Sequence, residues 1–231
     1  MTEQNQQLVN LDSAAVVDTS LLAFGAGMSV QDRVDVKNSY LLANLVANKR
    51  ANASRPDEIW FTYFLEVMQD CGWTRIHYSY DREEASQQSM KLSNVALAAV
   101  RTAAASLAGG ATAAAVLGTV ASDALQRLAK DETALAFFKR NVQERKSATV
   151  GLGVCRQLDS GEVILAMGAL QSMSRTSDMD VLFFDWDAST TTTYKAIAAW
   201  VFNRSLYKDR REEVESKLAN HAKAKIAAYE I

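Results

Sequence analysis

Apolar positions recur at helical spacing through the first half of the chain. Over residues 32–52 they place one apolar side on a predicted helix, formed by Leu41, Leu42, Leu45 and Val46. A second helix is predicted from Pro56 to about Cys71, because proline is typical of the first helical turn and Gly72 is typical of a helix end. Its buried side is expected to be aromatic, with Trp60, Phe61, Phe64, Leu65 and Met68.

Residues 82–130 have helical periodicity throughout, interrupted only by Gly109 and Gly110. Their apolar positions form two lines of similar spacing, one on each side of these glycines. The lines are Leu92, Ala96, Ala99, Ala103 and Leu107, then Ala113, Leu117, Val120, Ala124 and Leu128. We therefore expect an antiparallel helical hairpin, rich in Ala and Gly, with Gly109 and Gly110 at its corner.

The segment from Thr102 to Ser122 contains no formal charge and consists almost wholly of Ala, Gly, Ser, Thr and a few aliphatic residues. Small residues recur at every fourth position, in what we call the small-residue stripe: Ala98, Thr102, Ser106, Gly110, Ala114, Gly118 and Ser122. Such a stripe permits two helix backbones to approach closely, in a membrane or in a core. It is too poor in strongly apolar side chains to predict a constitutive membrane span.

Other segments have the alternation and β-branched content of strands. Strands are predicted at residues 73–81, 147–158, 162–173 and 180–187, with a tight turn at Asp159–Gly161, and further helices at 190–203 and 205–229. Successive strands without crossover helices favour antiparallel pairing. The expected fold is α+β, with an antiparallel sheet of about three to five strands packed with helices that include the Ala/Gly-rich hairpin.

The first thirty residues are polar and weakly periodic. They predict a flexible N-terminal arm over residues 1–30, followed by a single α+β domain over residues 31–231. The arm lacks the positive and apolar regions of a secretory signal, so we expect the protein to be made in the cytoplasm. Release or export by a route that needs no such signal stays open.

Charge narrows the range of partners. The chain carries 27 acidic and 25 basic side chains, and its formal net charge of -2 comes without the basic block that would neutralise nucleic-acid phosphates. Nucleic acid is therefore not expected as a partner. The two cysteines, Cys71 and Cys155, do not make a disulfide framework, and we expect both to be free and buried.

One motif points to catalysis. The string VLFFDWDAST, residues 181–190, resembles the first motif of the haloacid dehalogenase-like phosphatases, in which Asp185 would be the nucleophile and Asp187 the acid/base, assisted by magnesium. The motif departs from the family at Ala188, where glycine is usual, and too little chain follows for the family's later motifs. The alternative is a strand that ends at a helix N-cap.

Metal and cofactor signatures are absent from the sequence. His77 and His221 stand far apart without Cys or His partners at metal spacing, and no glycine-rich phosphate loop with its lysine is present. We expect no catalytic residues, no metal and no cofactor.

The leading hypothesis is a non-enzymatic, membrane-active effector of the pore-forming or toxin type, a virulence factor stored in a soluble fold. The insertion or oligomerisation element would be the hairpin, with site residues Thr102, Ser106, Gly109, Gly110, Ala114, Gly118 and Ser122. Its expected partners are a lipid membrane, under some conditions, and other copies of the chain. The alternatives are a soluble, self-associating binding or scaffold protein, and a metal-assisted phosphohydrolase using Asp185 and Asp187.

Overall fold

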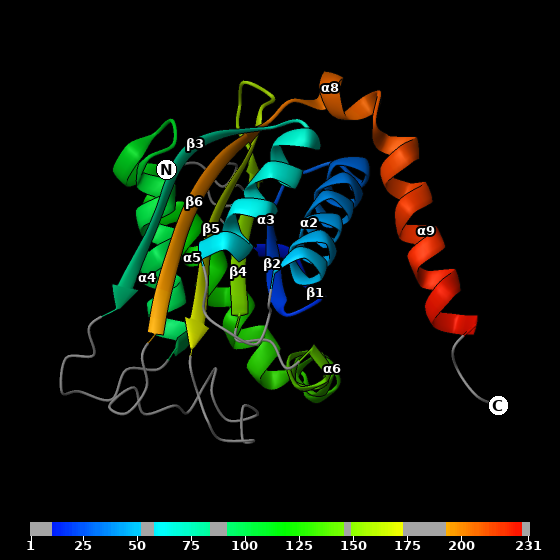
Figure 1. The fold of residues 1–231 in the computed structure, drawn as a ribbon. Helices are drawn as coiled ribbons and strands as arrows, with labels where there is room; N and C mark the ends of the chain where they lie inside the picture. Colours follow the sequence, from blue (N-terminus) through cyan, green and yellow to red (C-terminus); the bar gives the residue numbers. More distant parts are fainter. Residues whose placement is uncertain (1–10, 52–57, 84–91, 146–148, 173–192, 228–231) are drawn as a thin grey trace.

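The computed structural model describes residues 11–51, 58–83, 92–145, 149–172 and 193–227. In these residues a six-stranded mixed sheet lies between two layers of helices (Figure 1). The α+β class expected from the sequence is confirmed, although the sheet has more strands than predicted. Its two faces bury two separate hydrophobic cores, one under each helical layer.

The sheet has the strand order β1-β2-β4-β5-β6-β3. The strands are β1 (Leu11–Val17), β2 (Ser20–Gly25), β3 (Trp73–Glu83), β4 (Thr149–Gln157), β5 (Val163–Ser172) and β6 (Thr193–Phe202). The predicted hairpin of β4 and β5 is confirmed, with Gly161 at φ +87° in its turn. All neighbours pair antiparallel except β2 and β4, which pair parallel, so the purely antiparallel sheet was a wrong expectation.

The flexible arm predicted for residues 1–30 is wrong for residues 11–25, which form β1 and β2 and join the same sheet as β4. The side chains of β2 are buried along its whole length, because β2 lies between two strands and under helices on both faces. A strand buried on both faces does not alternate between apolar and polar residues, so the periodic signal of a strand is missing. Residues 1–10 lie outside the described part of the chain.

The helix predicted for residues 190–203 is also wrong, because residues 193–202 form β6 between β5 and β3. Its central residues, from Ala196 to Trp200, are all buried. Like β2, β6 is buried on both faces, so its apolar residues form a continuous run and do not alternate with polar ones. The periodicity of such a run does not distinguish a strand from a buried helix. The strand predicted at residues 180–187 lies outside the described residues.

One face of the sheet is covered by α2 (Val30–Arg50) and α3 (Glu58–Asp70). The aromatic side of α3 is buried as predicted. The buried side of α2 differs from the prediction, since Leu41, Leu42, Leu45 and Val46 are only half-buried. Polar residues share the buried side because they are hydrogen-bonded there: Trp73 Nε1 donates to Ser39 Oγ at 3.0 Å, and the Tyr40 hydroxyl donates to Ser20 Oγ at 3.0 Å.

The other face is covered by α4 (Leu92–Ala105), α5 (Gly110–Lys130) and α6 (Glu132–Arg145). The antiparallel hairpin of α4 and α5 is confirmed. α4 lies over β4, β5 and β6, and α5 lies over β1, β2 and β4. The hairpin thus lies over five of the six strands, from β1 to β6.

The chain continues from β6 into α8 (Arg204–Lys208) and α9 (Arg211–Ala227). The helix predicted over residues 205–229 is therefore divided by a short link at Asp209–Arg210. α9 lies beside α2 and runs down the edge of the molecule (Figure 1). It belongs to neither of the layers that cover the sheet.

Candidate functional site

The corner of the hairpin requires its glycines. Gly109 has φ +102° and Gly110 has φ +48°, values that residues with a side chain rarely adopt. The amides of Thr112 and Ala113 both donate to the carbonyl of Gly109, which starts α5 without a side-chain cap. The predicted corner is therefore confirmed, and its backbone conformation explains why a glycine pair interrupts the helical pattern.

The inner side of the hairpin is part of the protein core. Both predicted apolar lines are buried, as far as their side chains are described. The buried members are Ala96, Ala99, Ala103, Leu107, Ala113, Leu117, Val120, Ala124 and Leu128. They pack on side chains of the central strands, among them Leu152, Ile164 and Ile197. Because most of them are alanines, the helices lie close to the sheet.

The small-residue stripe does not form one surface. Its α4 members Ala98 and Thr102 face solvent, whereas Gly118 in α5 is buried. A Cβ atom added to Gly118 would lie 2.7 Å from Nε of Arg101, so the Arg101 side chain lies directly over this glycine. The close approach at Gly118 is therefore made within the hairpin, by α4 of the same chain.

The remaining predicted site residues are divided in the same way. Ser106 and Gly109 are exposed near the corner, while Gly110, Ala114 and Ser122 are half-buried. The stripe residues of α4 thus lie on its solvent side, whereas those of α5 lie on the side that faces α4. No single partner helix could contact all of its members at once.

A second surface of small residues lies on the solvent side, which we call the outer hairpin face. It consists of the exposed residues Ala98, Thr102, Ala105, Ala111, Ala115 and Thr119. The Thr102 hydroxyl donates to the carbonyl of Ala98 at 3.0 Å, and the Thr119 hydroxyl donates to the carbonyl of Ala115 at 3.0 Å. Both hydroxyl donors are therefore used within their own helices, and the threonines present methyl groups as well as oxygen to the outside.

The outer hairpin face is almost uncharged. Between residues 94 and 119 the only charged exposed side chain is Arg101. α9 is different, because Glu212, Glu213, Glu215 and Lys217 are all exposed on it. The solvent-facing surfaces of the two helical regions therefore differ in chemistry, and only α9 has the charged character of an ordinary solvated helix.

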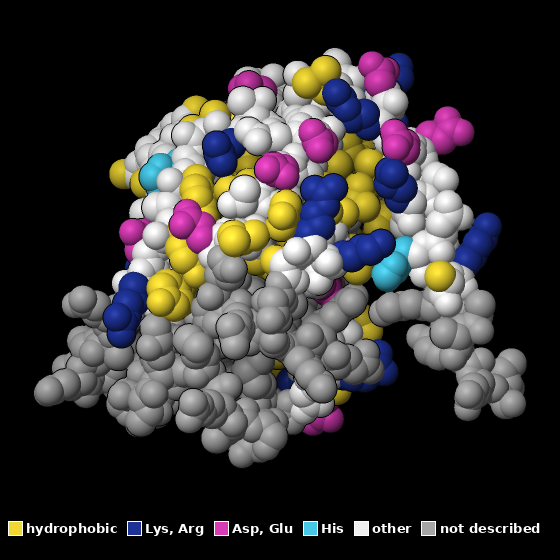
Figure 2. All heavy atoms as spheres, in the orientation of Figure 1, with side chains coloured by type: hydrophobic (Ala, Val, Ile, Leu, Met, Phe, Trp, Pro, Cys, Tyr) yellow, Lys and Arg dark blue, Asp and Glu magenta, His cyan; other side chains and the backbone are white. Residues whose placement is uncertain are grey.

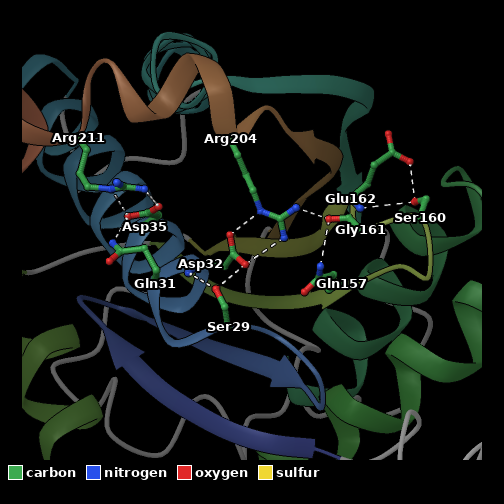
Figure 3. Close-up of polar contacts among 10 residues, drawn as sticks. All are labelled: Ser29, Gln31, Asp32, Asp35, Gln157, Ser160, Gly161, Glu162, Arg204 and Arg211. Carbon is green, nitrogen blue, oxygen red and sulfur yellow. Dashed lines mark hydrogen bonds and ion pairs between the residues drawn. The ribbon is translucent and has the colours of Figure 1, made fainter.

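Polar contacts concentrate elsewhere, where α2 meets the C-terminal helices (Figure 3). Arg204 donates to both carboxylate oxygens of Asp32, at 2.7 and 3.0 Å, and also to the carbonyl of Gly161. Arg211 donates to both oxygens of Asp35, at 2.9 and 2.6 Å. Burial raises the pKa of Asp32, but hydrogen bonds from Arg204 and Ser29 outweigh this effect, so that the pKa lies below its ordinary value.

These two ion pairs are not predicted by the sequence. Their partners lie more than 170 positions apart in the chain, with separations of 172 and 176 residues. The acids Asp32 and Asp35 fall in the first two turns of a helix, where carboxylates are common for other reasons. No signal in a single sequence connects them to their arginines.

The other candidate residues do not form a reactive site within the described residues. Cys71 and Cys155 are free and buried, as expected. Burial raises the pKa of Cys71 to about 12, assisted by the nearby Asp70, and burial also raises the pKa of Cys155. Neither thiol is therefore activated.

The described residues contain neither a metal-ligand cluster nor a helix fit to span a membrane. Among these residues, no group of three or more His, Cys, Asp or Glu side chains could hold a metal ion. His77 lies on β3 and His221 on α9. Asp185 and Asp187 lie outside the described residues. None of the described helices combines the length and the apolar character that a membrane span requires.

Comparison with known proteins identifies no family for this chain. No protein-family model matches the chain, and a search of curated proteins finds no match. Among solved structures, similarity is found to the Evf virulence factor, with 9% sequence identity and a TM-score of 0.34, over 93% of this chain and 86% of that one. An overlap of this quality establishes neither a shared fold nor a shared function.

Proposed function

We propose that the protein is a non-enzymatic effector that acts by self-association through the outer hairpin face. The observation that carries the proposal is the chemistry of this face: small residues, internally bonded Thr102 and Thr119 hydroxyls, and one charge, at Arg101. Two such faces can pack closely because no long side chain other than Arg101 separates them. A contact between identical faces is also the usual basis of a homodimer.

The size of the face predicts a weak dimer. On α5 the face runs from Ala111 to Thr119, eight steps of about 1.5 Å, so it is about 12 Å long, and two adjacent helices make it roughly 20 Å wide. It therefore offers about 240 Å² per partner, compared with about 800 Å² for a stable interface of standard size. We expect a dimer of low affinity that forms at high protein concentration.

A second candidate is the membrane-active form, in which the hairpin leaves the sheet and the apolar lines face lipid. Its support is the uncharged first part of α5, Gly110–Ser122, which is 13 residues and about 20 Å long and would need other copies of the chain to enter a hydrocarbon core of ~30 Å. α4 has 14 residues and a length of about 21 Å, so a complete two-helix insertion would leave α4 too short. In this form the approach of the Arg101 side chain to Gly118 would remain the contact between the two helices.

Size-exclusion chromatography with light scattering tests self-association. The informative variants are Ala98→Glu on α4 and Ala115→Glu on α5, since each places a charge on the face at an exposed helical position. The matched control is Ala219→Glu, at an exposed position of α9. We expect wild type and control to form the same oligomer and the two hairpin variants to be monomeric. A wild type that stays monomeric at high concentration would refute the proposal.

Liposome flotation and dye release across a range of pH distinguish the two candidates. Leakage caused by the wild type and altered by Gly110→Leu or Gly118→Leu would support the membrane-active form. A stable oligomer that neither binds nor permeabilises liposomes would leave self-association as the function.

The hydrolase hypothesis stays a prediction on Asp185 and Asp187. Incubation with magnesium and a generic phosphate ester tests it, with Asp185→Asn as the control. Absence of turnover would remove it.

A further inference from the structure

α9 makes little apolar contact with the rest of the protein. Among its described side chains only Val214 is buried, and Leu218 is half-buried. The remaining described positions, apart from the half-buried Arg211, are exposed. Burial of one or two aliphatic side chains contributes about 1.5–3 kcal/mol each, which is little to hold a helix of 17 residues.

A groove remains between α9 and the body. The cavity, of about 430 Å³, has an apolar floor that includes Leu42, Val46 and Val67, together with the buried Cys71. Charged residues from both sides surround the floor, among them Arg50 and Lys217. Figure 2 shows hydrophobic side chains in the hollow between α2 and α9, bordered by basic and acidic ones. α9 therefore spans the groove without filling it.

α9 is attached to the body mainly through an ion pair at its first residue, Arg211. Arg211 forms the bidentate pair with Asp35, whose side chain is 2% exposed and also accepts a hydrogen bond from Gln31 at 2.8 Å. The guanidinium also lies 5.8 Å from the ring centre of Tyr207, at the end of α8. The Arg211 side chain is 32% exposed, so water and salt reach the pair from one side.

We propose that α9 is a releasable strap, held over the groove by the Asp35–Arg211 pair and detached when this pair is broken, with α8 remaining in place. α8 stays because Tyr207 is fully buried against Phe202, with ring centres 5.3 Å apart, and because Arg204 is bound separately to Asp32. The link at Asp209–Arg210 between the two helices is the hinge. Detachment exposes the apolar floor of the groove and the Cys71 thiol.

The two cysteines provide the test. Cys71 lines the groove, whereas Cys155 lies fully buried in β4, in the centre of the sheet. The native protein is treated with a thiol-reactive disulfide reagent at pH 8, and each cysteine is followed by peptide mass analysis. The variants are Asp35→Asn and Arg211→Gln. The control is Glu212→Gln, at an exposed position of α9 that does not line the groove.

We expect the labelling of Cys71 to become at least tenfold faster in both strap variants, with Cys155 protected and with the control equal to wild type. Equal acceleration at Cys155 would mean global unfolding, and no acceleration at Cys71 would mean that the pair does not hold α9. Either result would overturn the proposal.

A measurement on the wild type is independent of any folding defect in the variants. Raising sodium chloride from 0.05 to 1 M should accelerate Cys71 labelling several-fold, since salt screens a partly exposed pair but does not weaken apolar contacts. A rate that does not change with salt would contradict the proposal.

Discussion

Gly168 of β5 lies directly beneath Ala99 of α4. A Cβ atom added to Gly168 would lie 2.6 Å from the Cβ of Ala99 and 2.6 Å from the carbonyl oxygen of Ala96. Contacts this short do not occur between real atoms, so the absence of a side chain at position 168 sets the distance between the hairpin and the sheet. The Ala-rich composition of α4 and the glycine in β5 are two parts of the same close contact.

Gly168→Ala should therefore destabilise the protein. The obstructing atoms belong partly to the backbone of α4, so the helix must move away from the sheet. We expect a loss of about 1–3 kcal/mol in the free energy of unfolding, the usual cost of overpacking. Urea denaturation followed by circular dichroism measures the loss. An unchanged midpoint would mean that α4 can move freely on the sheet.

Gly118→Ala should have the opposite effect. The three atoms nearest its added Cβ all belong to the side chain of Arg101, which is exposed and can turn away. The substitution also removes a glycine from a helix interior, which is worth up to about 1 kcal/mol. We expect unchanged or increased stability in the same denaturation experiment. A loss as large as that of Gly168→Ala would show that Arg101 is fixed in place.

Much of the fold could be predicted from the sequence where an element is buried on one side only. The aromatic side of α3 contrasts with polar residues on its opposite side, and the two apolar lines of the hairpin recur at helical spacing on each side of the glycine pair; both predictions are confirmed. β6 and β2 are buried on both sides and lack this contrast. By sequence alone the run of β6 predicts a helix and that of β2 predicts part of a flexible arm, because only the neighbouring strands decide their structure.

The candidate site was predictable only in part, for a similar reason. The two apolar lines and the glycine pair between them predict the hairpin and its corner at Gly109 and Gly110. The four-residue spacing of small residues suggested one surface, but packing divides it, because Arg101 covers Gly118 while Thr102 faces outward. Which side of a helix faces the protein depends on the sheet below it, and that information lies in distant segments.

Alkaline pH should destabilise the protein through its buried thiols and phenols. Burial raises the pKa of Cys71 to about 12 and raises the pKa values of Cys155 and Tyr40, whereas a free thiol ionises near pH 8.5 and a free phenol near 10. Between about pH 8.5 and 12 the unfolded chain therefore loses protons that the folded one keeps, and stability falls as pH rises. Urea denaturation between pH 7.5 and 10 should show this fall, and it should be less steep in the double variant Cys71→Ala, Cys155→Ala. Parallel curves would mean that the thiols ionise in the folded protein.

Acid should abolish the contribution of the Asp32–Arg204 pair. The folded-state pKa of Asp32 lies below its ordinary value of about 3.9, so the pair stabilises the protein fully above that pH and is lost as the pH falls through the lower, folded value. Arg204→Ala should cost about 1–3 kcal/mol at pH 7, because Asp32 then keeps its burial without its main partner. The difference in unfolding free energy from wild type should persist down to about pH 4 and shrink below it.

Lys208→Ala, at an exposed position of α8, is the control and should match wild type at every pH. If the cost of Arg204→Ala were the same at pH 7 and pH 3, it would arise from lost packing of the arginine side chain and from its lost hydrogen bond to the Gly161 carbonyl. The ion pair would then contribute nothing to stability.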